Sequence, residues 1–161
     1  MRILKYLVLG ILLLYFQIML APKFALYGII PNFFLAYLVY LNIRQDRKIV
    51  LPIAFLLGLA LDLTYPSLLG MNTFAFIVVS LLINSYHENI NKRRFIIVLL
   101  GIIVVNIVYY LIFMFYHIIS SLILPRFFLL AMFAVFFNTI FTTITLYLFI
   151  IAEKFRFTIN V

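Results

Sequence analysis

The stretch Gly58-Leu-Ala-Leu-Asp62-Leu-Thr-Tyr-Pro66-Ser-Leu-Leu-Gly70 decides the fold of this chain. Asp62 is the only formally charged residue between Lys48 and Glu88, and its neighbours are mostly apolar. A carboxylate in apolar surroundings must be hydrogen-bonded, hydrated or protonated, because burying a lone ion has a high free-energy cost. Pro66 disfavours helical geometry at the residue before it. The stretch therefore predicts two helices joined by a tight turn.

The composition indicates that a membrane surrounds most of the chain. Of the 161 residues, 68% are hydrophobic and only 10% are charged, and a water-soluble domain could not bury so much apolar surface. The sequence predicts an all-α, polytopic integral membrane protein in which residues 1–161 form a single transmembrane domain. The first apolar run, from Tyr6 to Pro22, lacks a cleavage site of the signal-peptide type and is interpreted as a retained helix.

Uncharged runs separated by short charged segments define the expected helices. A membrane-spanning helix needs about 20 apolar residues, so the long run from Ile49 to His87 is divided at the turn around Pro66. Six transmembrane helices are predicted, at about residues 5–20, 26–43, 49–64, 70–86, 95–117 and 127–151.

The basic residues predict the orientation of these helices. The formal net charge is +8, but the charges lie in short loops rather than in a patch suited to nucleic acid. If the N-terminus is cytoplasmic, every Lys and Arg except Lys23 and Arg126 falls on the cytoplasmic side, as the positive-inside rule requires. We therefore expect both termini in the cytoplasm, the lipid bilayer as the surroundings and no nucleic-acid partner.

Few residues in the chain could carry out chemistry. There is no cysteine, there are two histidines, and Asp and Glu together number four, which excludes thiol catalysis and leaves metal binding poorly supplied. Intramembrane aspartyl proteolysis needs two facing aspartates, yet Asp46 lies in a basic loop. His117 and Ser120 have no orienting acid nearby in sequence. We predict a protein that is not an enzyme and has no catalytic residue, metal or cofactor.

Asp62 has both a structural and a functional interpretation. A helix that starts at Ile49 carries it roughly 20 Å into a membrane core about 30 Å thick, close to the start of the next helix, whose free backbone N–H groups favour an anion. Gly58, one turn earlier, would let another backbone approach closely, and Gly70 suits the re-entry into that helix. On this interpretation Asp62 fixes a helical hairpin. Substrate binding, proton transfer and direct contact with a partner are the alternatives.

Polar residues of the last predicted helix share one face. Asn138 and Thr142 are four residues apart, as are Thr139 and Thr143, so all four lie together on a helix. Either the hydroxyls bond to their own helix and the amide joins two helices, or the face lines a cavity or receives a partner helix.

The residues around Asp62 carry a family resemblance. The run from Gly58 to Leu63 with Gly70 after the turn, together with Pro31-Asn32-Phe33 before an apolar helix, resembles the signature of the bacterial rod-shape-determining MreD family. The resemblance implies a multi-pass, non-enzymatic scaffold subunit of the inner (plasma) membrane, in the complex that makes lateral peptidoglycan during cell elongation. It also implies binding to the transmembrane helix of MreC and, indirectly, to MreB, RodA and a class B penicillin-binding protein.

A second resemblance supplies an alternative function. The MreD family is similar in fold to the six-helix substrate-binding subunits of energy-coupling-factor vitamin transporters, which implies a pocket near Asp62 and the loops around Lys23 and Arg126. The scaffold hypothesis instead places partner contacts at Gly58 and on the Asn/Thr face of the last helix. The candidate structural or partner-binding residues are Pro31, Asn32, Gly58, Asp62, Pro66, Gly70, Asn138 and Thr142.

Overall fold

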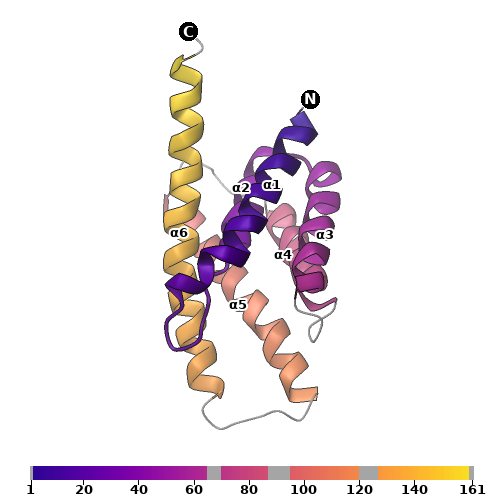
Figure 1. Ribbon diagram of the computed structural model, residues 1–161, viewed down its shortest axis with the longest axis vertical. Coiled ribbons are helices and arrows are strands. Elements are labelled where there is room, and N and C mark those ends of the chain that lie inside the picture. The colour runs from indigo at the N-terminus through magenta and orange to yellow at the C-terminus, as the bar shows by residue number, and fades with distance from the viewer. Residues whose placement is uncertain (1, 65–69, 87–94, 120–126, 160–161) are drawn as a thin grey trace.

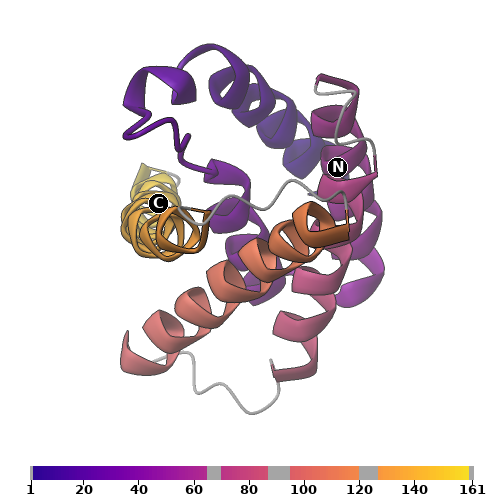
Figure 2. The ribbon, with the colours of Figure 1, turned by 90° about the horizontal axis from the view of Figure 1, so that it is seen from below.

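Six α-helices and one short 3₁₀ helix make up the part of the chain that the structure describes (Figures 1 and 2). The computed structural model describes residues 2–64, 70–86, 95–119 and 127–159. Across these ranges there is no β-strand, only an isolated bridge between Leu26 and Ile29, so the prediction of an all-helical chain with six α-helices is confirmed. The elements are α1 (Arg2–Met19), η1 (Ala21–Phe24), α2 (Phe33–Arg44), α3 (Arg47–Thr64), α4 (Met71–Tyr86), α5 (Phe95–Ile119) and α6 (Phe127–Ile159).

α2 lies at the centre of the bundle and packs against each of the other five α-helices. Every residue from Phe33 to Asn42 is buried, as expected for a helix that is apolar on all sides. The ring of Phe34 lies 5.8 Å from that of Phe76 in α4, and the ring of Tyr37 lies 6.0 Å from that of Phe149 in α6. The apolar sequence of α2 therefore places it inside the protein rather than against lipid.

The predicted range of this second helix, 26–43, is wrong because its first part is not helical. Leu26 and Ile29 exchange two backbone hydrogen bonds of 3.1 and 2.9 Å across a tight turn. Tyr27 and Gly28, at the centre of the turn, have φ angles of 51° and 80°, a left-handed conformation that an α-helix does not contain and that two-residue hairpin turns favour.

The true start of α2 is set by Pro31 and Asn32. Pro31 disfavours helical geometry at the residue before it. Asn32 is the N-cap, and its side-chain oxygen accepts a hydrogen bond of 3.0 Å from the backbone N–H of Phe34, which is the usual way for Asn to begin a helix. The hydropathy of residues 26–43 is nearly uniform, so it does not reveal where the helix begins.

The other helices begin and end within a few residues of their expected ranges, except that α6 continues to Ile159. Within the described helices, two segments are long and apolar enough to cross a membrane, Val98–Ile118 in α5 and Phe128–Glu153 in α6. At 1.5 Å per residue α2 is only about 18 Å long, less than the thickness of about 30 Å of a bilayer core. Six membrane crossings with cytoplasmic termini therefore stay a prediction.

Both chain termini lie at the same end of the bundle, which we call the termini end (Figure 1). α3 runs away from the termini end and α4 returns beside it, so the two helices form an antiparallel hairpin (Figure 1). α5 and α6 diverge toward the opposite end (Figure 1). Figure 2 shows α6 end-on and α5 running obliquely across the bundle. The divergence separates the C-terminal part of α5 from the N-terminal part of α6.

Candidate functional site

Asp62 is fully buried near the end of α3 and accepts four hydrogen bonds from the first turn of α4. The backbone N–H and the side-chain amide of Asn72 donate to Oδ1 at 2.9 and 3.0 Å. The backbone N–H and the hydroxyl of Thr73 donate to Oδ2 at 3.0 and 2.6 Å. An ionised carboxylate only accepts hydrogen bonds and has about four lone-pair sites, so these donors use its full capacity.

The position of Asp62 follows from the needs of a buried helix start. The first N–H groups of an α-helix have no partner within the helix, and the partial positive charge there favours an anion. Asp62 supplies the missing acceptor from the neighbouring helix, so it caps α4 across the hairpin. A carboxylate whose lone pairs are all occupied has no capacity left for a substrate while these bonds persist.

Gly58 makes the close packing at this junction possible. A Cβ atom built on Gly58 would lie 2.4 Å from the Cα atom and 2.8 Å from the N atom of Thr73, distances that no real side chain tolerates. Gly70, just before α4, has a φ of 91°, which favours glycine. We call Gly58, Asp62, Asn72 and Thr73 the α3–α4 seam. Pro66 lies outside the described residues.

Tyr109 connects the α3–α4 seam to α5. Its hydroxyl donates a hydrogen bond of 2.9 Å to the side-chain oxygen of Asn72, and its ring is buried against Phe76 and Phe113. Asn72 therefore donates to Asp62 with its nitrogen and accepts from Tyr109 with its oxygen. Three helices are joined by this chain of hydrogen bonds.

The start of α2 is capped in the same manner by its neighbours. The backbone N–H of Asn32 donates to the side-chain oxygen of Asn138 in α6 at 2.6 Å. The backbone N–H of Phe33 donates to the side-chain oxygen of Gln17 in α1 at 2.9 Å, and the amide of Gln17 donates to the carbonyl of Pro31 at 3.0 Å. Two buried helix starts, those of α2 and α4, thus obtain their partners from other helices.

The remaining bonds of the α6 face are mostly internal. The amide of Asn138 also donates to the Tyr110 hydroxyl and, at 3.1 Å, to the carbonyl of Ala134. The hydroxyls of Thr139 and Thr143 bond to carbonyls of their own helix at 2.7 Å. Thr142 is buried and lies 3.5 Å from the amide nitrogen of Asn106 in α5. Asn138 and Thr142 therefore point into the bundle, where the chain's own helices cover them.

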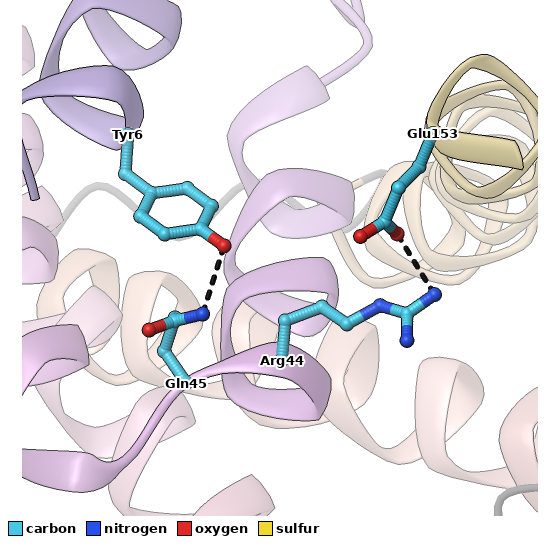
Figure 3. Close-up of polar contacts among 4 residues, drawn as sticks. All are labelled: Tyr6, Arg44, Gln45 and Glu153. Carbon is cyan, nitrogen blue, oxygen red and sulfur yellow. Dashed lines mark hydrogen bonds and ion pairs between the residues drawn. The ribbon is translucent and has the colours of Figure 1, made fainter. Parts of the chain in front are cut away.

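A second set of polar contacts lies at the termini end (Figure 3). Gln45, just after α2, donates a hydrogen bond of 2.8 Å to the hydroxyl of Tyr6 in α1, and Tyr37 donates to the carbonyl of Tyr6 at 2.5 Å. Arg44 Nη2 lies 2.8 Å from Glu153 Oε2 in α6, a close ion pair without the alignment of a hydrogen bond. These contacts join α1, α2 and α6.

A cavity of about 480 Å³ lies where α5 and α6 diverge. Its floor includes Asn32, Asn72, Tyr109 and Tyr110, so it borders both capped helix starts. The rest of its lining comes from the end of α1, the turn before α2, Leu61, α5 and the first turns of α6. His117 also lines this cavity, whereas Ser120 lies outside the described residues.

Of the residues proposed from sequence, the structure brings together two groups. Gly58, Asp62 and Gly70 lie at the α3–α4 seam, while Pro31, Asn32 and Asn138 lie at the start of α2. Thr142 belongs to neither group and faces α5.

Several residues in these networks were not singled out from sequence. Asn72 and Thr73, which donate to Asp62 from the first turn of α4, could have been suspected from sequence. They follow Gly70 and Met71 directly, and polar residues at a helix start are often capping groups. The remaining ones, Gln17, Tyr109 and Tyr110, join helices far apart in sequence and carry no local signal.

Fold and polar core together define a class of protein: a helical membrane protein whose buried polar groups join its own helices. Within the described ranges no cluster of His, Asp and Glu could hold a metal ion. The family described as rod shape-determining protein MreD matches residues 1–156. The chain therefore belongs to the MreD family, a family of shape-determining membrane proteins. No curated protein and no solved structure matches the chain.

Proposed function

We propose that this protein is a non-enzymatic scaffold subunit of the bacterial inner membrane that holds together the complex for lateral peptidoglycan synthesis. It binds the transmembrane helix of MreC and, through MreC, associates with MreB, RodA and a class B penicillin-binding protein. Family membership supports the role in rod-shape determination. The specific partners follow from the resemblance and are the part to be tested.

The observation that carries this proposal is the use of the buried polar groups. Asp62 caps the start of α4, and Asn138 and Gln17 cap the start of α2, all within the chain. Such groups are needed inside a bilayer because unsatisfied backbone N–H groups cannot bond to water there. The side chains that could serve chemistry are thus occupied in holding the fold, as a structural subunit requires.

The structure leaves neither of the two surfaces suggested from sequence open to a partner helix. Gly58 is packed against the backbone of Thr73, and Asn138 and Thr142 are buried. Both surfaces that the sequence suggested for MreC are therefore covered by the chain's own helices. A partner helix has to contact the outward faces, which carry large exposed apolar side chains such as Phe74, Leu111 and Phe136.

The distribution of basic residues supports the proposed orientation. Lys5, Arg44, Arg47 and Lys48 belong to the helix ends at the termini end, while Lys23 follows α1 at the other end. This asymmetry supports a cytoplasmic location of the termini end, because the positive-inside rule favours basic residues on that side.

Purification of the tagged full-length chain from native membranes under mild detergent tests the proposal. We expect MreC and RodA to co-purify, and an unrelated tagged multi-pass protein from the same membranes to bring down neither. Specific recovery of an ATP-binding-cassette ATPase in their place would overturn the scaffold function. That outcome would favour the transporter alternative, for which the cavity beside Tyr109 and Tyr110 is the supporting observation.

A further inference from the structure

We infer that the cavity between α5, α6 and the turn before α2 is a binding site for one uncharged amphiphile, with an apolar body and a hydroxyl or amide end. Its volume of about 480 Å³ lies in the range of roughly 300–1,000 Å³ that is typical of small-molecule sites. The site does not depend on the scaffold function, because residues of this chain line the cavity.

Small residues and the course of α5 create the space. α6 contributes Ala131 and Ala134 to the wall, where larger side chains would fill the gap. α5 contributes Tyr110, Met114 and His117, which lie close together on a helix because their spacings are four and three residues. Figure 1 shows that α5 diverges from α6 toward the end of the bundle opposite the termini.

Of the two tyrosine hydroxyls on the floor, that of Tyr110 retains a hydrogen-bond donor. The Tyr109 hydroxyl donates to Asn72 and also has a side-chain hydrogen bond with Asn32. The Tyr110 oxygen accepts a hydrogen bond from Asn138, and its own hydrogen has no acceptor among the described residues. A tyrosine hydroxyl both donates and accepts, so Tyr110 offers a ligand one hydrogen-bond donor beside the ring of Tyr109. The two rings are in edge-to-face contact, with centroids 5.3 Å apart, which fixes their relative position.

The charge and polarity of the lining define the chemical class of the ligand. Among the described residues of the lining there is no Lys, Arg, Asp or Glu, and an unpaired ion placed beside them would lose its hydration without compensation. Ile18, Leu61, Phe113 and Leu130 form apolar walls, which suit a hydrocarbon or ring system. A hydroxyl or amide matches the floor because the oxygen of either group can accept the hydrogen of Tyr110.

The turn before α2 fixes one side of the cavity. Gly28, Ile29 and Ile30 line the cavity, and the ring of Tyr27 contacts Phe133 of α6 with centroids 5.5 Å apart. The turn is therefore held against α6 rather than left without support. A rigid side wall lowers the entropic cost of binding a small molecule.

Native mass spectrometry of the full-length chain tests the inference with two probes. Dioleoylglycerol in the bilayer of a nanodisc represents a ligand supplied by the membrane, and octyl glucoside added to the buffer represents one supplied by water. We expect wild-type protein to retain one molecule of at least one probe. Retention of dioleoylglycerol alone identifies the membrane as the source, and retention of octyl glucoside alone identifies water. If neither probe is retained, the site does not exist.

Variants of neighbouring residues separate this cavity from unspecific binding. Ala131→Phe fills the cavity and should abolish retention. Met132→Phe adds a ring at the next position of α6, where the side chain is 61% exposed, and should bind like wild type. Tyr110→Phe removes one hydroxyl and should weaken binding about tenfold, the equivalent of one hydrogen bond.

The folded state of each variant is checked by its melting temperature. Retention by Ala131→Phe equal to that of wild type overturns the inference. If Ala131→Phe does not fold, the nearly isosteric Tyr110→Phe decides, and unchanged affinity in that variant likewise overturns it. Loss of MreC co-purification with retained probe binding would overturn the scaffold function alone.

Discussion

Asp62 and Glu153 both join helices through a carboxylate, but their environments differ. Asp62 is 0% exposed and accepts four hydrogen bonds, two of them from backbone N–H groups. Glu153 lies at the termini end with its side chain 25% exposed, opposite Arg44 with a side chain 43% exposed. The acceptor sites of Asp62 are therefore all filled inside the bundle, whereas the carboxylate of Glu153 belongs to a partly exposed side chain at its end.

The difference in environment determines how much the fold depends on each carboxylate. The donors around Asp62 belong to a helix start that has no other acceptor, so removing the carboxylate leaves buried N–H groups unpaired. Arg44 can turn to water when Glu153 is lost, because exposed ion pairs contribute little. We expect substitutions at the α3–α4 seam to have far larger effects than substitutions at the termini end.

The strongest test of the seam is Gly58→Leu, which forces a side chain into the backbone of α4 at Thr73. Because backbone atoms cannot turn aside as side chains do, we expect a loss of unfolding free energy of more than about 3 kcal/mol. Reversible denaturation in detergent micelles, followed by circular dichroism, measures it. Gly101→Leu in α5 is the matched control, since a Cβ atom there meets nothing within 4 Å. Similar stability of the two variants would contradict the close packing of α3 and α4.

Asp62→Ala should be the next most severe change, with a loss of about 2–3 kcal/mol from four unpaired donors. Asp62→Asn keeps one acceptor oxygen, and the Thr73 hydroxyl can rotate to accept from the new amide. Only the backbone N–H of Thr73 then lacks a partner, so we expect a loss of about 1 kcal/mol for Asn. The same denaturation assay ranks the variants. If Asn is as destabilising as Ala, the negative charge at the start of α4 matters more than the number of acceptors.

Capping of α4 by Asp62 could be anticipated from sequence because its parts are close together. Asp62 and its partners at the start of the next helix are only 10 and 11 residues apart, on either side of Pro66, and the need of a helix start for an acceptor is general. Gly58 could be predicted as a point of close packing for a similar reason, because it lies one turn before Asp62 on the same helix. Contacts between residues that are close in sequence can therefore be predicted from the local sequence pattern.

The start of α2 and the cavity could not be predicted in this way. Asn32 and Asn138 meet across 106 residues, and no local pattern in either segment specifies the other. The turn at Tyr27 and Gly28 was hidden because a uniform apolar run is compatible with a helix, although Gly28 and Pro31 were the residues that could have signalled it. A cavity is a property of how helices diverge, which a single sequence does not encode locally.

Tyr109→Phe tests how far the seam extends beyond its own two helices. The variant keeps the ring packing and removes the hydrogen bond to Asn72, so we expect a loss of about 1 kcal/mol. Tyr15→Phe in α1, where the side chain is 65% exposed, should leave the stability unchanged. A loss at Tyr109 no larger than at Tyr15 would mean that Asn72 is held by Asp62 alone. Thermal unfolding of the two variants side by side measures the difference.

The ion pair at the termini end should show the smallest effect. A double-mutant cycle of Arg44→Met and Glu153→Gln isolates the interaction of the two side chains from their other contacts. Because both groups reach solvent, we expect a coupling energy of about 0.2–1 kcal/mol, and less at high salt. A coupling energy that exceeds the loss in Asp62→Asn would reverse the order of the two carboxylates. The ion pair at the termini end would then contribute more to the stability of the bundle than the second oxygen of Asp62 does at the α3–α4 seam.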